Sequence, residues 1–470
     1  MKKKSKKTKK TVSEKIIRRC KACGLTTLDR TCLVCGERTK KMPKLEQQVI
    51  VRYPRKRSKL MLEYKDQIEI IESRCVDFLC PGKVTGVKVG PLVVEYEFSP
   101  AKMTRLKKLR DIHEDLAMTL EADTVMINRV PGRGAVCITV PKKDRETIVF
   151  ADSLKSFVKV HKDYILPINL GISANGEPYI IDLTKMPHLL VAGSTGAGKS
   201  NLLNCILTSL LYCRSVQQLQ LVLIDPKCVE LTAYNDIPHV KEDVVSNVYN
   251  ALALLETMVQ EMRKRMSFLL YQKVKSLKEL NEKCDRENRP DDKLPYIVIV
   301  IDEMADLVLQ EKKAFTKLMA EISSMSRAAG IHIIAATQRP SVDVLAGKIK
   351  VNFPARVAFR VPSAPDSKTV LNEKGAEKLL AQGDMLFINP NATGLQHLHA
   401  PLILEEDIRN MKNLSLQYGH FNRSPVDGKP PKAMTDRPEM GYCQTCDKNV
   451  GRYDKEHLSH NVEFKQSDKK

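Results

Sequence analysis

The stretch HLLVAGSTGAGKSNLL at positions 188–203 constrains the fold of this chain more than any other. An apolar, strand-like run precedes a glycine-rich segment, and a helix-prone run follows it. The segment fits the pattern GxxxxGK[ST], whose glycines let backbone N–H groups surround phosphate oxygens at the N-terminus of a helix. A chance glycine-rich turn would not need both flanking elements. We therefore predict a nucleotide site that includes Gly193, Ser194, Thr195, Gly196, Ala197, Gly198, Lys199, Ser200 and Asn201.

A second feature, YIVIVIDE at 296–303, ends an apolar run with two adjacent carboxylates. We predict that Asp302 holds Mg²⁺ through water, with the Ser200 hydroxyl as a further ligand, and that Lys199 reaches the outer phosphates. Glu303 is predicted to orient or deprotonate the attacking water, which is a poor nucleophile without such a group. Strands often end in acidic residues, so this feature alone is only moderately specific. Together with the phosphate loop it predicts an NTPase, and ATP is the expected nucleotide.

Two further apolar runs, LQLVLIDPK at 219–227 and HIIAATQRPS at 332–341, also end in polar residues. Gln338 is the candidate sensor, because an uncharged polar group there can contact both the γ-phosphate and the water. Asp225 and Lys227 could belong to the same site or form a structural ion pair. Arg327, in SSMSRAAG, is either a surface helix residue or a finger offered to a neighbouring subunit's phosphate.

Five short, continuously apolar runs recur between 161 and 405, and longer helix-prone stretches alternate with them. Continuous apolar runs of this kind indicate strands buried on both faces of a mainly parallel sheet. The predicted fold class is α/β, a doubly wound P-loop domain, with a small α+β domain before it and small Cys-rich modules at both ends. The runs are PHLLVAG, LQLVLID, YIVIVID, IHIIAAT and ARVAFRV.

Composition along the chain suggests six regions. A basic arm and a Cys-rich module come first, then a helical connector, the α+β domain, the motor domain, a polar, Pro-rich linker and a Cys/His module. The predicted boundaries are 1–44, 45–74, 75–160, 161–410, 411–440 and 441–470.

The Cys residues are concentrated at the two ends. Two CxxC pairs separated by eight residues form a zinc-ribbon-like set near the N-terminus, and a CxxC followed by HxxH near the C-terminus resembles a Cys2His2 finger with an unusually short loop. Disulfides or free thiols remain the alternative for the first set, and two surface histidines near an unrelated CxxC for the second. The predicted Zn²⁺ ligands are Cys20, Cys23, Cys32, Cys35, Cys443, Cys446, His457 and His460.

The charge balance points to a polyanionic partner. There are 77 Lys+Arg against 56 Asp+Glu, a formal net charge of +21, and much of the excess lies in 1–10 and 51–59. Nucleic acid fits this balance best, with a solvated basic surface or anionic lipid as alternatives. No run approaches the 18 apolar residues of a membrane span, and no apolar stretch follows the basic N-terminus as in a signal peptide. We therefore expect a cytoplasmic protein without an integral membrane segment.

The segments quoted above, together with VLIDPKCVELTAYNDIPHV and DSKTVLNEKGAEKLLAQGDMLF, resemble the motor domain of the FtsK/SpoIIIE DNA translocases. The region 75–160 resembles the small α domain that precedes that motor. The resemblance implies a RecA-like P-loop motor fold and a homo-hexameric ring that uses ATP hydrolysis to pump double-stranded DNA. By position it makes Lys199, Ser200, Asp302, Glu303 and Gln338 the working residues of the site and Arg327 a residue acting in trans, with DNA-gripping loops near 339–352.

The chain also departs from that family. It lacks the N-terminal membrane spans of the septum-anchored members, its C-terminus does not read as their winged-helix domain, and the Cys-rich ends are additions. The ends could bind DNA or dock protein partners. The competing hypotheses are a related ring ATPase acting as a helicase or a DNA-packaging motor, and a slow nucleotide-dependent DNA-binding scaffold. Glu303 and Gln338 argue against the scaffold, which has no need of a positioned water.

Overall fold

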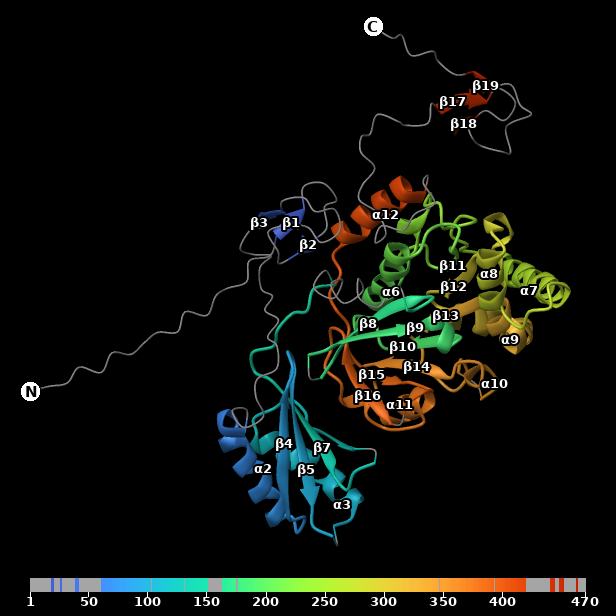
Figure 1. Ribbon diagram of the computed structural model, residues 1–470. Coiled ribbons are helices and arrows are strands. Elements are labelled where there is room, and N and C mark those ends of the chain that lie inside the picture. Colours follow the sequence, from blue (N-terminus) through green and yellow to red (C-terminus); the bar gives the residue numbers. More distant parts are fainter. Residues whose placement is uncertain are drawn as a thin grey trace, which may run out of the picture. The chain divides into compact units, whose positions relative to one another are not determined.

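The computed structural model of the chain (Figure 1) describes residues 61–419 except 103, 131, 151–162, 175, 346 and 393, and the backbone of six short strands nearer the ends. The chain divides into two compact units, Met1–Asp427 and Gly428–Lys470. Each unit contains one three-stranded antiparallel sheet made of these short strands, in the orders β2-β1-β3 and β18-β17-β19. The strands are β1 (Arg18–Cys20), β2 (Thr26–Thr27), β3 (Thr39–Lys41), β17 (Met440–Cys443), β18 (Lys448–Gly451) and β19 (Val462–Glu463).

Residues 65–141 form a four-stranded antiparallel sheet, in the order β4-β5-β7-β6, with three helices. Strand β5 alternates buried and partly buried residues, and Tyr96 and Phe98 join Ile71 of α2 in one hydrophobic core. The elements are α2 (Lys65–Asp77), β4 (Gly82–Val89), β5 (Val93–Pro100), α3 (Leu106–Asp111), α4 (His113–Thr119), β6 (Met126–Arg129) and β7 (Val136–Pro141).

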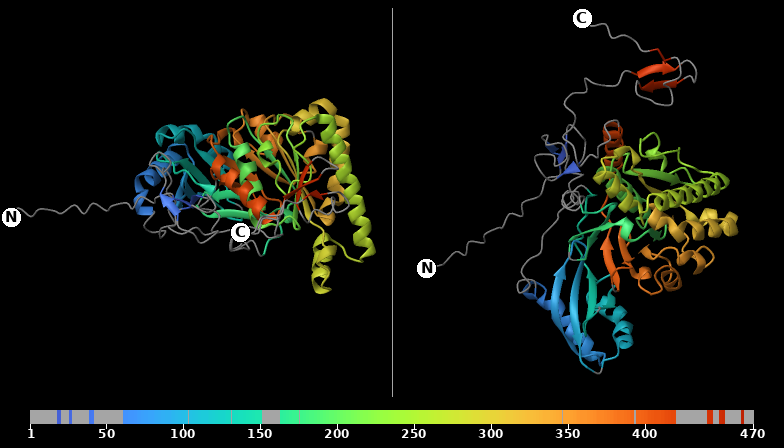
Figure 2. Two further views of the ribbon diagram at one scale, coloured as in Figure 1. Left: turned by 90° about the horizontal axis from the view of Figure 1, so that it is seen from above. Right: turned by 45° about the vertical axis from the view of Figure 1, so that its right-hand side comes forward.

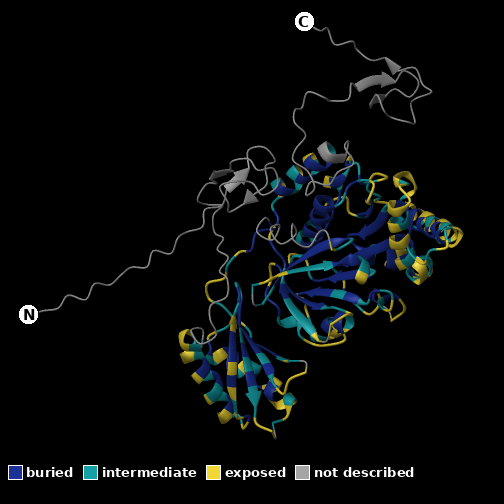
Figure 3. Cartoon of the chain, viewed as in Figure 1, coloured by how far each residue is buried: buried dark blue, intermediate teal, exposed yellow. Residues whose placement is uncertain are grey.

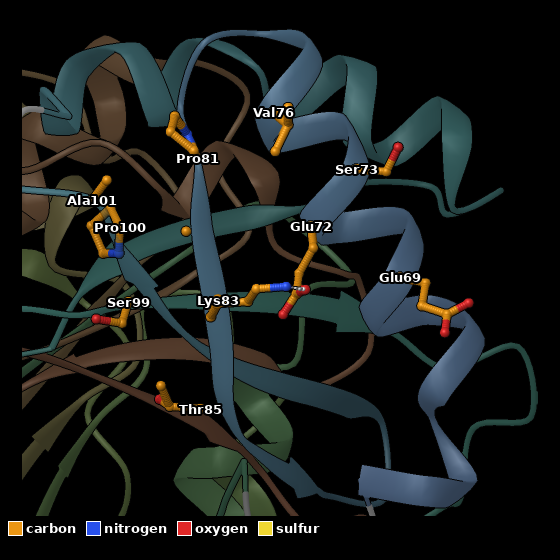
Figure 4. A pocket seen from close by; sticks show the side chains of 11 residues that line it. Glu69, Glu72, Ser73, Val76, Pro81, Lys83, Thr85, Ser99, Pro100 and Ala101 are labelled. Atoms are coloured by element: carbon orange, nitrogen blue, oxygen red, sulfur yellow. Dashed lines mark hydrogen bonds and ion pairs between the residues drawn. The ribbon is translucent and has the colours of Figure 1, made fainter.

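A surface cleft of about 760 Å³ lies between α2 and the strands β4 and β5. Figure 4 shows Glu69 and Glu72 on the helix and Lys83 on the strand, with the Lys83 ammonium directed at Glu72. The Lys83 Nζ donates to Glu72 Oε2 at 2.7 Å, and the Val84 N–H donates to Glu72 Oε1 at 2.8 Å. Both oxygens of Glu72 are thus satisfied within the protein, and the cleft offers no unpaired charge at this residue.

Residues 167–399 build a nine-stranded sheet in the order β11-β12-β13-β10-β14-β15-β16-β8-β9. The five apolar runs predicted as strands are β11, β12, β13, β10 and β14, and they pair in parallel as expected. The bounds are β8 (Pro167–Ser173), β9 (Pro178–Asp182), β10 (His188–Ala192), β11 (Leu219–Ile224), β12 (Tyr296–Ile301), β13 (Ile331–Thr337), β14 (Ala355–Phe359), β15 (Asp384–Ile388) and β16 (Leu395–His399).

Antiparallel pairing joins β14, β15, β16, β8 and β9 at the other end, so the sheet is mixed, with mostly parallel strands. Strands β8 and β9 are consecutive and joined by a few residues, and so are β15 and β16. A connection that short can only reverse the chain, whereas parallel pairing needs a crossover of a dozen residues or more. The prediction of a mainly parallel sheet is confirmed for the block that carries the phosphate loop, and the antiparallel pairs were not predicted.

Helices cover both faces of the sheet (Figures 1 and 2), and the strands are the most deeply buried part of the chain (Figure 3). Alternate residues of one strand enter two different cores: Leu189 and Val191 of β10 lie in one, and Leu190 and Ala192 in the other. This explains the continuously apolar runs. The elements are α6 (Lys199–Cys213), α7 (Val248–Tyr271), α8 (Leu277–Arg286), α9 (Met304–Ala329), α10 (Gly347–Lys350), α11 (Ala364–Leu371), α12 (Glu405–Gly419) and the 3₁₀ turns η2 (Leu183–Lys185), η3 (Thr232–Tyr234), η4 (Pro290–Asp292) and η5 (Ala376–Lys378).

Within the described residues, none of the helices combines the length and the apolar character that crossing a membrane requires.

Candidate active site

The predicted site residues lie at the carboxyl edge of the parallel strands. The phosphate loop follows β10, Gln338 follows β13, and Asp302 and Glu303 follow β12. Strand β13 lies between β10 and β12, so the three segments are immediate neighbours. Parallel pairing thus brings together residues that are more than a hundred positions apart in the sequence.

The phosphate loop needs its glycines for conformation and for space. Gly196 has φ +76° and Gly198 has φ +120°, values that residues with a Cβ rarely adopt. A Cβ on Gly193 would lie 2.6 Å from the Cβ of Phe359, whereas a Cβ on Gly196 would meet nothing within 4 Å. The loop is therefore closed on its strand side and open on the side where phosphates would lie.

Three main-chain hydrogen bonds fix the loop to its neighbours. The Gly193 N–H donates to the Thr337 carbonyl at 3.2 Å, and the Ser194 N–H donates to the Arg360 carbonyl at 3.0 Å. The Gly383 N–H donates to the Ala197 carbonyl at 2.9 Å. Gly383 was not predicted, because neither its type nor its spacing reveals that the turn before β15 supports the loop.

Lys199 is buried and paired with the acidic strand end. Its Nζ donates to the Asp302 carboxylate at 2.6 Å and to the Asp302 carbonyl at 2.7 Å, and the two side chains are 3% and 1% exposed. Burial raises the pKa of Asp302, while the Lys199 charge and hydrogen bond oppose that rise. Each of these two charges therefore depends on the other.

Glu303 is 2% exposed, and its carboxylate is held from several sides. Oε1 accepts from the Thr337 hydroxyl at 2.8 Å and from the Ala305 N–H at 3.2 Å, which makes Glu303 the N-cap of α9. Oε2 accepts from the Gln338 N–H at 3.0 Å. In this state the carboxylate is committed to protein donors.

Gln338 links this group to the phosphate loop, because its side-chain oxygen accepts from the Thr195 hydroxyl at 2.8 Å. The N–H of Gln338 binds Glu303 and its amide binds the loop, so one residue contacts both. The structure thus forms two adjacent groups, the Lys199–Asp302 pair and the chain of hydrogen bonds from Glu303 through Gln338 to Thr195.

Asp225 and Lys227 do not form an ion pair with each other, which was one of the two possibilities that the sequence allowed. The Asp225 carboxylate accepts from four main-chain N–H groups, those of Lys227, Val229, Glu230 and Leu231, at 2.9–3.0 Å. Asp225 is therefore a structural residue that shapes the turn after β11. The Lys227 ammonium lies 3.6 Å from Glu303 Oε2 instead.

Three predicted residues lie outside these two groups. Ser200 is half-buried in the first turn of α6. The Asn201 amide donates to the Pro401 carbonyl at 2.6 Å, and its oxygen accepts from the Ile403 N–H at 3.0 Å. Arg327 is exposed near the C-terminal end of α9, beside the amino edge of the sheet where β13 begins.

Of the basic residues expected to grip DNA, Arg339 and Lys348 are exposed. The Lys350 ammonium donates to the Asn372 side chain at 2.8 Å and to the Thr369 carbonyl at 3.0 Å. The Lys350 ammonium is therefore already hydrogen-bonded to other residues of the same domain.

Only two of the predicted zinc ligands lie in described elements. Cys20 ends β1 and Cys443 ends β17, each in its own antiparallel sheet. The other six, Cys23, Cys32, Cys35, Cys446, His457 and His460, lie outside the described residues. Where the chain is described, no group of three or more His, Cys, Asp or Glu side chains is arranged as a metal site.

The geometry fits a nucleoside triphosphate with Mg²⁺. The open side of the loop faces the N-terminus of the 15-residue helix α6, where main-chain N–H groups and the helix dipole favour an anion. Lys199 supplies a buried cation, and the Ser200 hydroxyl and Asp302 carboxylate supply the oxygen donors that Mg²⁺ prefers.

Comparison with known proteins supports the resemblance found in the sequence. Residues 154–342 match the FtsK/SpoIIIE family, and residues 46–142 match the FtsK alpha domain. Relatives named DNA translocase FtsK include those of Staphylococcus aureus, 39% identical over 82% of this chain and 48% of the relative, and Rickettsia prowazekii, 38% identical over 81% and 54%. The chain spans about half the length of the curated relatives it matches. The solved structure of the pCW3 conjugation coupling protein TcpA, a monomer with ATPgS, shares the fold at a TM-score of 0.51 and 24% identity, over 75% of this chain and 99% of that one.

Proposed function

The chain belongs to the FtsK/SpoIIIE family through its FtsK/SpoIIIE and alpha domains, and on this basis we propose that it is an ATPase that translocates double-stranded DNA. The observation that carries the proposal is the arrangement at the carboxyl edge, in which Lys199, Asp302, Glu303 and Gln338 meet beside an open phosphate loop. The named relatives, DNA translocases, supply the substrate class.

The residues have distinct tasks in this proposal. Lys199 leaves its contact with Asp302 and binds the outer phosphates of ATP. Ser200 and Asp302 hold Mg²⁺, which when bound neutralises charge on the phosphates. Glu303 accepts a hydrogen bond from the attacking water and then its proton. Gln338 binds Thr195 of the loop through its side chain and Glu303 through its N–H, so that a movement of the loop shifts the position of Glu303.

We place Arg327 at a neighbouring subunit's site, in a homo-hexamer. Helix α9 begins directly after Glu303 and runs 26 residues to the opposite edge of the sheet. The helix is kinked at Glu311, and the seven residues of β13 lead back from its end to the carboxyl edge, which at about 3.3 Å per residue puts Arg327 and its own phosphate loop roughly 20 Å apart. An exposed arginine at that edge can serve a nucleotide only in another subunit, as it would in a ring.

We also propose a Zn²⁺ site near each end of the chain. The four-cysteine set and the set of two cysteines and two histidines suit a closed tetrahedral Zn²⁺ site, and metal would supply folding energy to segments with little apolar content. The basic stretches 1–10 and 51–59 near the first set favour a role in binding DNA, with protein docking as the other use. The cytoplasmic location stays a prediction.

Metal analysis of the purified full-length chain tests the zinc sites. We expect about two equivalents of Zn²⁺ per chain if each donor set closes one four-ligand site. Cys20→Ser and Cys443→Ser are each expected to remove one of them. Less than half an equivalent in the unaltered chain would contradict both sites.

Hydrolysis in the presence of duplex DNA tests the activity itself. The ATPase rate is expected to rise on addition of double-stranded DNA, because a motor couples hydrolysis to its track. A rate that duplex DNA leaves unchanged would contradict the translocase. Preferential stimulation by single strands, with strand separation, would favour a helicase instead.

A further inference from the structure

The catalytic carboxylate proposed above is held in a resting arrangement. The Thr337 hydroxyl and the Gln338 N–H both donate to Glu303, at 2.8 and 3.0 Å. Thr337 is fully buried in β13, so these donors belong to rigid structure. Each of these hydrogen bonds uses an acceptor site of the carboxylate that is then not available to the attacking water.

Lys227 adds a charge from the opposite side. It follows β11, the neighbour of β12 on the side away from β13, and its Nζ lies 3.6 Å from Glu303 Oε2. The Lys227 N–H donates to the buried Asp225 carboxylate at 3.0 Å, which fixes the main chain at the base of the side chain. The side chain itself is 43% exposed, against 2% for Glu303.

Lys227 differs from the other donors because its main chain is fixed while its charged side chain can rotate. The main-chain N–H of Gln338 can release Glu303 only if the end of β13 moves, and the Thr337 side chain is fully buried, whereas the half-exposed ammonium of Lys227 can leave by rotating its own side chain. The competing ligand is the terminal phosphate of ATP, an anion with more negative charge than one carboxylate. Lys227 and the phosphate loop lie at the same edge of the sheet.

We propose that Lys227 is a positioning residue that holds Glu303 in its resting orientation, and that the γ-phosphate of ATP competes with Glu303 for its ammonium, so that Glu303 stays restrained in part of the ATP-bound chains. The inference rests on the proposed hydrolysis at this site and deepens it. Lys227 thereby slows hydrolysis even when ATP is bound. Removing its charge weakens the restraint and raises the rate of unproductive hydrolysis.

The test compares ATP hydrolysis without DNA in the unaltered chain and in Lys227→Met. The variant is expected to hydrolyse about two- to five-fold faster at saturating ATP, the change expected from loss of a half-exposed ion pair. Its KM for ATP is expected to rise, because a phosphate contact is lost. Lys227→Arg should keep both values near those of the unaltered chain, and Lys241→Met, an exposed lysine on the same connection from β11 to α7, should change neither.

The salt dependence of DNA-free hydrolysis distinguishes a restraint by charge from a purely structural role of Lys227. Raising KCl from about 50 to 300 mM screens a half-exposed ion pair, so the DNA-free rate of the unaltered chain should rise and that of Lys227→Met should stay level. A DNA-free rate that falls or stays unchanged in Lys227→Met would overturn the restraint. A chain that shows these effects but is not stimulated by duplex DNA would contradict the translocase and leave the inference on Lys227 standing.

Discussion

Lys199→Met is expected to abolish ATP binding and to lower the free energy of unfolding by about 3–5 kcal/mol, the cost of leaving one member of a buried ion pair without its partner. Asp302 is 1% exposed, and Lys199 opposes the rise that burial imposes on its pKa. Without the lysine, the carboxylate must lie uncompensated or take up a proton. Denaturant unfolding and binding of a fluorescent ATP analogue measure the two effects.

The double variant Lys199→Met/Asp302→Asn separates stability from function. Removing both charges is expected to restore most of the lost stability, because no buried charge is left unpaired, while ATP binding stays absent. The pH dependence of stability in Lys199→Met provides a further test. In Lys199→Met the folded state has a raised Asp302 pKa and binds the proton more tightly than the unfolded chain, so the deficit should shrink as the pH is lowered toward that pKa. A single variant as stable as the unaltered chain would contradict this account of the pair.

Glu303→Gln is expected to lower the rate of hydrolysis by about 10²- to 10⁴-fold while ATP still binds, because an amide cannot take the proton of the attacking water. The amide oxygen can still accept from the Thr337 hydroxyl and the Ala305 N–H, so α9 keeps a capping acceptor. The amide nitrogen then takes the place of Oε2, the acceptor of the Gln338 N–H, so we expect the free energy of unfolding to fall by about 1–3 kcal/mol without loss of the fold. Single-turnover hydrolysis and nucleotide binding test this.

The control for that variant is Asp306→Asn, a half-buried carboxylate in the first turn of the same helix. It removes one negative charge close to Glu303 without touching the proposed base, and its rate should stay within a few-fold of the unaltered chain. A comparable loss in both variants would show that helix charge, rather than proton transfer, explains the effect.

The local part of the site could be predicted from sequence. The phosphate loop, its preceding strand and the acidic pair each have a pattern set by neighbouring residues, and the five apolar runs placed them on parallel strands at one edge. Those elements are β10 to β14, and the structure confirms all five strands. Once the strands are parallel, their polar ends must meet.

What escaped prediction depends on contacts between distant segments. Whether Lys227 pairs with Asp225 or Glu303 is decided by the turn that Asp225 shapes with its own main chain. Gly383 supports the phosphate loop through one hydrogen bond from a segment almost two hundred residues away. The antiparallel pairs β8–β9 and β15–β16 were not predicted, although each joins consecutive strands through a connection too short for parallel pairing.

The most direct test of the central claim is displacement of a protein roadblock from linear duplex DNA, with Glu303→Gln as control. A translocase is predicted to remove the roadblock with ATP, without separating the strands, and the Glu303→Gln chain to leave it in place while still binding ATP. If the unaltered chain hydrolyses ATP on duplex DNA and the roadblock stays bound, or leaves equally with Glu303→Gln, the chain does not convert hydrolysis into movement along DNA and the proposed function is wrong.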